Sequence, residues 1–162
     1  MHQKITPNLW FDTEAEEAAG FYTSVFENSR IVNVTHYPEA APRPAGMVMT
    51  VEFELDGHRF VAINGGPEFT FDEAVSLQIH CETQDEVDYY WDKLIEGGGE
   101  HGPCGWLKDR FGLSWQVVPE GMAELFEDPD PSRKERAMEA MLKMSKLDIA
   151  ELRRAADGVP AA

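Results

Sequence analysis

The chain is poor in basic residues: 14 lysines and arginines stand against 30 aspartates and glutamates, a formal net charge of -16. Nucleic-acid backbones and anionic membrane surfaces are bound through clustered cations, so this balance argues against both kinds of partner. Two cysteines, Cys81 and Cys104, are too few for a disulfide framework. No apolar run approaches the roughly 20 residues of a membrane-spanning helix, and the first residues lack the apolar region of a signal peptide. We therefore expect a soluble, cytoplasmic protein that binds neither nucleic acid nor membranes.

A strand followed by a helix is predicted twice along the 162 residues. Apolar residues alternate with polar ones over residues 5–12 and again over residues 75–81, which is the period of a strand with two different faces. Each stretch is followed by a capping box, which marks the start of a helix. Thr13 aligns with Thr83 and Glu16 with Glu86, an offset of 70 residues in both cases. The sequence therefore contains an internal repeat.

Further strands complete each half of the repeat. Residues 31–37, 47–55 and 58–64 read as strands in the first half, and Asp56-Gly57 is a hairpin signal between the last two. Short strands around 103–108 and 113–118 follow in the second half. The pattern predicts an α+β fold of two βαβββ modules, residues 1–66 and 75–119, which together form one domain with a curved mixed sheet. Residues 120–162 are expected to be a helical C-terminal extension with a possible dimer contact.

One face of each strand is apolar and should carry the helix, so the opposite, concave face is the place for a small-molecule site. Strand alternation puts four amides on that face, from the first, fourth, fifth and last strands: Asn8, Asn64, Gln78 and Gln116. Trp10 shares the face and could stack on a ligand. The amides could equally well satisfy backbone groups and waters at a seam of the sheet.

Two residues are candidates for catalysis. His80 has the concave orientation and could act as a general base, although a histidine at the rim of the sheet explains it more simply. Cys104 is expected on a strand at the mouth of the cavity, with His101 nearby in a loop. A nucleophilic thiol needs a base or cation in a fixed position, so a structural cysteine is the simpler interpretation.

Several stretches carry a resemblance to a known family. The sequence resembles the vicinal oxygen chelate superfamily, which groups glyoxalases, bleomycin-resistance proteins and ring-cleaving dioxygenases. Within it, the sequence is similar to the PhnB-like branch, whose domain is often labelled 3-demethylubiquinone-9 3-methyltransferase. The stretches that carry the resemblance are 5–11, Phe21-Tyr22, 64–67, 104–106, 109–116 and, in the tail, 137–141 and 148–150. The resemblance implies a glyoxalase-like fold and a homodimer.

The resemblance also implies where a metal would lie. Members of the superfamily typically hold a divalent metal with His, Gln or Glu side chains of the first, fourth, fifth and eighth strands. Carried over, these positions fall at Thr6, near Asn64, at Ser76 and at Gln116. None of these side chains is a carboxylate or an imidazole, and neutral amides bind transition metals weakly. We therefore expect no metal and no other cofactor.

The residues favour a metal-independent protein that binds a small molecule of unknown identity. Its ligand would be held by the four amides and one tryptophan named above: Asn8, Trp10, Asn64, Gln78 and Gln116. One alternative is a lyase, isomerase or dioxygenase of the superfamily's type with a divergent metal site, and another is a dimeric interaction protein. Methyl transfer is not expected, because neither glycine run, at 65–66 or at 97–99, connects a strand to a following helix as a nucleotide-binding turn does.

Overall fold

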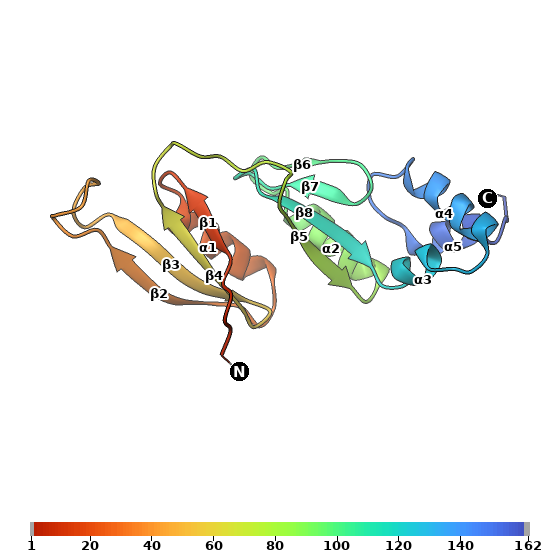
Figure 1. The fold of residues 1–162 in the computed structure, drawn as a ribbon, viewed down its shortest axis with the longest axis horizontal. Coiled ribbons are helices and arrows are strands. Elements are labelled where there is room, and N and C mark those ends of the chain that lie inside the picture. Colours follow the sequence, from red (N-terminus) through yellow and green to blue (C-terminus); the bar gives the residue numbers. More distant parts are fainter. Residues whose placement is uncertain (1, 161–162) are drawn as a thin grey trace. The chain divides into compact units, whose positions relative to one another are not determined.

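The computed structural model describes residues 2–160. The chain divides after Phe71 into two compact units, and each contains one βαβββ module (Figure 1). The predicted α+β fold with two such modules is therefore confirmed. Within the described range, no helix combines the length and the apolar character that a bilayer crossing requires.

The first unit holds one helix and a four-stranded mixed sheet. Its elements are β1 (Asn8–Phe11), α1 (Ala15–Val25), β2 (Arg30–His36), β3 (Val48–Leu55) and β4 (His58–Asn64). The strand order is β1-β4-β3-β2, with β1 parallel to β4 and the other pairs antiparallel. Tyr22 of α1 and Phe53 of β3 are fully buried and their rings stack 6.2 Å apart, so the helix covers one face of this sheet.

The second unit repeats this arrangement and adds the tail. Its elements are β5 (Ser76–Cys81), α2 (Gln84–Lys93), β6 (Glu100–His101), β7 (Trp106–Lys108) and β8 (Ser114–Pro119). The strand order is β5-β8-β7-β6, and β5 is parallel to β8. The two-residue strand β6 was not predicted, because a pair of residues after a glycine run shows no periodicity. The strand predicted from residue 103 begins only at Trp106.

The two helices start differently, although both were predicted to carry a capping box. At α2 the threonine cap is present, since Glu86 N donates to Thr83 Oγ1 at 3.1 Å, and the Glu86 carboxylate reaches back to accept from Glu82 N, one residue before the cap. At α1 the prediction is wrong, because the N-cap residue is Glu14 rather than Thr13, and its side chain accepts no capping hydrogen bond. The first free amide of the helix, Ala15 N, donates instead to Asn64 Oδ1 at 2.8 Å.

The tail forms three helices that pack on one another within the second unit. They are α3 (Met122–Phe126), α4 (Pro131–Met141) and α5 (Ile149–Ala156). Their shared core consists of Leu125, Ala137, Leu152 and Ala156. Asp130 caps α4, since its side chain accepts from Ser132 N at 2.9 Å, and Pro131 occupies the first helical position.

Candidate functional site

The open face of the second sheet, opposite α2, carries a polar row across all four strands. Ser76 of β5 pairs with Ser114 of β8, Ser114 with Lys108 of β7, and Lys108 with Glu100 of β6. The alternate residues Trp115 and Val117 are buried on the helix side. Residues that are Cα partners on neighbouring strands point to the same face, so these four side chains stand side by side.

A second row runs parallel to the first. Gln78 pairs with Gln116, and Gln116 pairs with Trp106. Gln116 Nε2 donates to Ser76 Oγ at 2.8 Å, which ties the two rows together. The sequence prediction that Gln78 and Gln116 share the face opposite the helix is confirmed. Their role in binding a ligand stays a prediction.

A cavity of about 540 Å³ lies against the β6–β7 side of this sheet. This volume is typical of small-molecule sites, which range from roughly 300 to 1,000 Å³. Its lining includes Glu73, Glu100, Cys104, Trp106, Lys108 and Ser114. The cavity therefore adjoins the polar row, and three members of that row face into it.

Ser114 is the most unusual residue of this lining. It is 0% exposed, and its Oγ has no hydrogen-bond partner among the residues that the structure describes. A buried polar group without a partner costs about 1–3 kcal/mol. Because the hydroxyl both donates and accepts, a polar group of a bound molecule could remove this cost.

Lys108 and Glu73 form an ion pair at the same cavity. The hydrogen bond to Glu73 raises the pKa of the Lys108 ammonium, and the same bond lowers the pKa of the Glu73 carboxyl. Both groups therefore stay charged across the neutral pH range. The pair contributes no net charge to the cavity.

Asn64 lies on the other face of its sheet from the one predicted. Phe11 is its partner on β1 and is buried beneath α1, so Asn64 also faces the helix and is 1% exposed. The alternation in β4 was ambiguous because Val61 and Ile63 are as apolar as Phe60 and Ala62. Asn64 is thus a structural residue of the first unit.

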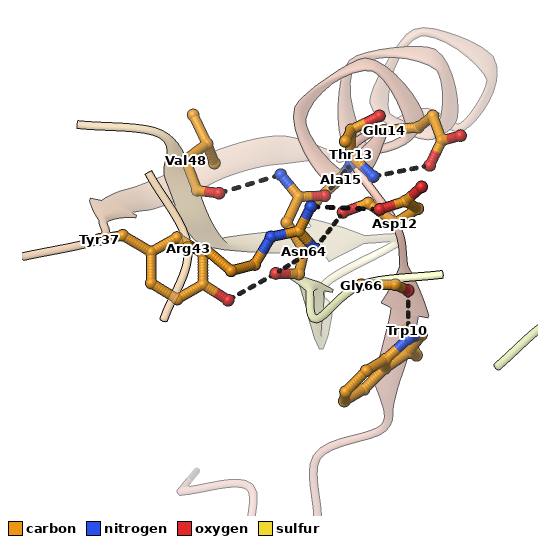
Figure 2. Close-up of polar contacts among 10 residues, drawn as sticks. All are labelled: Trp10, Asp12, Thr13, Glu14, Ala15, Tyr37, Arg43, Val48, Asn64 and Gly66. Atoms are coloured by element: carbon orange, nitrogen blue, oxygen red, sulfur yellow. Dashed lines mark hydrogen bonds and ion pairs between the residues drawn. The ribbon is translucent and has the colours of Figure 1, made fainter. Parts of the chain in front are cut away.

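Figure 2 shows how Asn64 joins four segments of the first unit. Besides accepting from Ala15 N, its Nδ2 donates to Val48 O at 3.0 Å. Its own carbonyl accepts from Tyr37 Oη at 2.5 Å. Arg43 donates to the carbonyl and the carboxylate of Asp12 close by, at 2.8 and 3.1 Å. The network fixes the start of α1 against β3 and β4.

Asn8 and Trp10 do lie on the face opposite α1, but their polar groups have local partners. Asn8 is exposed, and its Nδ2 donates to Thr6 O. Trp10 Nε1 donates to Gly66 O at 2.9 Å (Figure 2). A Cβ atom at residue 65 would lie 2.3 Å from the Trp10 ring, so Gly65 lets the loop after β4 pass directly over the indole. This packing explains Gly65, and Gly66 has a φ of 126°, which favours glycine.

Among residues 2–160, neither of the two catalytic candidates has a hydrogen-bond partner suited to catalysis. His80 is exposed near the end of β5, opposite Val118. Cys104 lies in the turn before β7 rather than on a strand, and its Sγ donates to Met141 O at 3.5 Å. His101 Nε2 donates to Trp91 O at 2.8 Å, and its ring stacks on Trp91 at 4.2 Å. The Nε2 proton of His101 is therefore committed to the backbone of α2.

The tail holds the turn that carries Cys104, which the sequence did not indicate. Cys104 N donates to Met144 O at 2.9 Å and Gly105 N to Ser145 O at 2.7 Å. Ser145 Oγ in turn donates to Gly102 O at 2.7 Å. Gly105 has a φ of 82°, and a Cβ there would lie 2.7 Å from Leu147. This part of the cavity wall therefore depends on residues 141–147 of the tail.

The family-like run 109–116 is explained by one buried carboxylate. Asp109 Oδ1 accepts from Phe111 N at 2.9 Å and Leu113 N at 3.1 Å. Its Oδ2 accepts from Trp115 Nε1 at 2.9 Å. Asp109 thus shapes the β7–β8 turn and orients the core tryptophan, which places Ser114 and Gln116 on the open face.

The residues at the superfamily's metal positions do not fit a transition metal. Asn64 uses its side-chain amide for Ala15 and Val48, and Gln116 and Ser76 are bonded to each other. Among residues 2–160, no three His, Cys, Asp or Glu side chains are grouped as metal ligands would be.

The two βαβββ modules define a member of the vicinal oxygen chelate superfamily, with the glyoxalase-like fold. Within it, the chain belongs to the family described as 3-demethylubiquinone-9 3-methyltransferase, whose model matches residues 3–118. The matched range ends before the tail. The glycine runs of the structure lead into a loop after β4 and follow α2, so neither forms the strand–turn–helix of a dinucleotide site.

Solved structures agree with this assignment. The PhnB protein of Bacillus cereus is 39% identical, with a TM-score of 0.64 over 72% of this chain and 99% of that one. Protein PA1353 of Pseudomonas aeruginosa is 20% identical, with a TM-score of 0.60 over 74% and 98%. The fosfomycin resistance protein FosX of Listeria monocytogenes, in complex with Mn(II) and sulfate, is 12% identical, with a TM-score of 0.55 over 78% and 96%. The last two likenesses show the fold alone. None of the curated proteins matches this chain.

Proposed function

We propose that this protein binds a small molecule, without a metal, at the cavity and open face of its second unit. The observation that carries the proposal is Ser114, a residue in the lining of a cavity of about 540 Å³, whose buried hydroxyl has no hydrogen-bond partner among residues 2–160. Gln78 and Gln116 on the same face supply further hydrogen-bonding groups. Asn64 is no longer part of the proposed site, whereas Asn8 and Trp10 stay predictions for the first unit.

The donor chemistry supports a site without a metal. The open face presents amides, hydroxyls, an ammonium group and an indole, and transition metals prefer imidazole, thiolate and carboxylate ligands. Elemental analysis of protein purified without an affinity tag is expected to find no stoichiometric transition metal. If the wild-type protein holds one equivalent of a transition metal and a Gln116 variant holds none, this part of the proposal is refuted.

Thermal shift with a fragment library, recorded with and without EDTA, tests the binding itself. A fragment present at ten times its Kd stabilises the native state by about 1.4 kcal/mol, which for this chain length is roughly 3–6 °C in Tm. We expect such shifts in both buffers. The double substitution Gln78→Leu and Gln116→Leu should abolish them while the Tm without ligand stays nearly constant. A library without a single reproducible shift would refute the proposal.

We also propose that the protein is a homodimer and that α4 contributes to the contact. Met138 and Leu142 are 40% and 64% exposed, and they are four residues apart, so they lie on one face of the helix end. An apolar pair of this kind is suited to a subunit contact. Size-exclusion chromatography with light scattering is expected to give twice the chain mass of 18.2 kDa. A monomer at micromolar concentration would contradict this.

A further inference from the structure

We propose that the ligand of the second unit's cavity is an uncharged carbonyl compound with an apolar body. Its oxygen accepts hydrogen bonds from Ser114 Oγ and the Lys108 ammonium. This inference rests on the proposed function and specifies the chemical class of its ligand.

Two residues with hydrogen-bond donors form one cross-strand pair in the cavity wall. Lys108 and Ser114 are direct partners in the antiparallel pair of β7 and β8, and both line the cavity. Side chains in such a pair start about 4.5–5.5 Å apart at Cβ. Ser114 Oγ has no partner among residues 2–160, and the Lys108 ammonium carries three N–H groups, of which the Glu73 contact does not use all. A single acceptor atom can therefore bond to both residues.

The charges of the lining disfavour an ionic ligand at this point. Glu73 and Glu100 place two carboxylates around the cavity and Lys108 places one ammonium. An anion that bonds to Lys108 would be repelled by the carboxylates of Glu73 and Glu100 and by the net charge of -16 of the whole chain. A cation would meet the ammonium of Lys108 directly beside Ser114. A neutral acceptor avoids both costs.

The rest of the lining suits an apolar body. Trp106, Pro103 and Leu107 line the cavity beside the polar row. Trp106 is the partner of Gln116, so its ring stands on the open face one row away from Ser114 and Lys108. A flat apolar group can lie against the indole while a carbonyl oxygen reaches the two donors.

Three isosteric probes of different charge test the inference: benzamide, benzoate and benzamidine. Protein-observed NMR titrations give a Kd for each from the amide shifts of the cavity residues. We expect benzamide to bind at least about tenfold more tightly than either ion. Ser114→Ala should weaken benzamide by about tenfold, because one hydrogen bond is lost. Ser132→Ala, at an exposed serine of α4, is the matched control and should change nothing.

Lys108→Met is a second variant with a different expected result. It should weaken benzamide and should also remove the discrimination against benzamidine, because the repelling ammonium is gone. Lys4→Met, at an exposed lysine of the first unit, is its control. Benzoate or benzamidine binding as tightly as benzamide, or benzamide binding unaffected by Ser114→Ala, would overturn the inference. If one of these results is found but other library fragments bind in the cavity, only the inference fails and the proposed function stands. If no fragment binds in the cavity, the inference and the proposed function are both overturned.

Discussion

Replacing Ser114 by alanine should stabilise the ligand-free protein, whereas most core substitutions destabilise. The hydroxyl is 0% exposed and unpartnered among the described residues, and such a group costs about 1–3 kcal/mol. Alanine keeps the Cβ atom and removes a single oxygen, so the additional void is small and its cost only partly offsets the gain. We expect a net gain of about 1 kcal/mol, which for a chain of this length is roughly 2–4 °C in Tm.

Differential scanning calorimetry of wild type and variant, without ligand, measures this change. Ser132→Ala is the matched control, since the same substitution at an exposed position should stay within about 0.5 kcal/mol. A fall in Tm on Ser114→Ala would show that the hydroxyl is satisfied in solution, for example by a bound water, and would refute the reasoning. A rise in Tm together with weaker ligand binding would show that stability is given up for function at this position.

The remaining predictions concern structural side chains and the two thiols. Asn64→Ala should lower the free energy of unfolding, measured by urea titration, by about 2–4 kcal/mol, because Ala15 N and Val48 O lose their partners. Asn8→Ala, at an exposed asparagine, should lower it by less than about 0.5 kcal/mol, and equal losses for the two variants would contradict the assigned roles. Asp109→Ala removes three hydrogen bonds and should cost at least about 3 kcal/mol, with a changed tryptophan fluorescence spectrum. Iodoacetamide at pH 8 should give a single adduct, on Cys104, because Cys81 is 0% exposed and burial raises its thiol pKa to about 12, so that almost no thiolate forms there. A second adduct under native conditions would contradict the buried position of Cys81.

The modules were predictable because their signals are local. A strand with alternating residues, a helix stripe and a hairpin at Asp56-Gly57 each depend on residues close together in sequence, and β4 was predicted with its exact bounds. The repeat then fixed the topology, since two copies of one pattern leave few arrangements. Alternation also placed Gln78 and Gln116 correctly, because Leu77, Ile79 and Val117 mark the buried side of their strands without ambiguity.

The site itself was less predictable, because its main features depend on contacts between distant residues. In β4 both alternating sets are apolar, so only the pairing of Asn64 with Phe11 shows which face carries the amide. Ser114 has no hydrogen-bond partner among the described residues, because Ser76 and Lys108 beside it direct their polar groups to Gln116 and Glu73. A hydroxyl group without a hydrogen-bond partner cannot be predicted from a local sequence pattern.

The tail has a role besides the predicted dimer contact. Residues 120–162 were predicted to be a helical C-terminal extension with a possible dimer contact. The structure adds backbone hydrogen bonds from the 102–105 turn to residues 144 and 145, across about 40 positions of the chain. Backbone groups donate and accept in the same way whatever side chain they carry, so such contacts leave no sequence signal. Since this turn lines the proposed ligand cavity, the tail supports the site directly, and this support requires no second subunit.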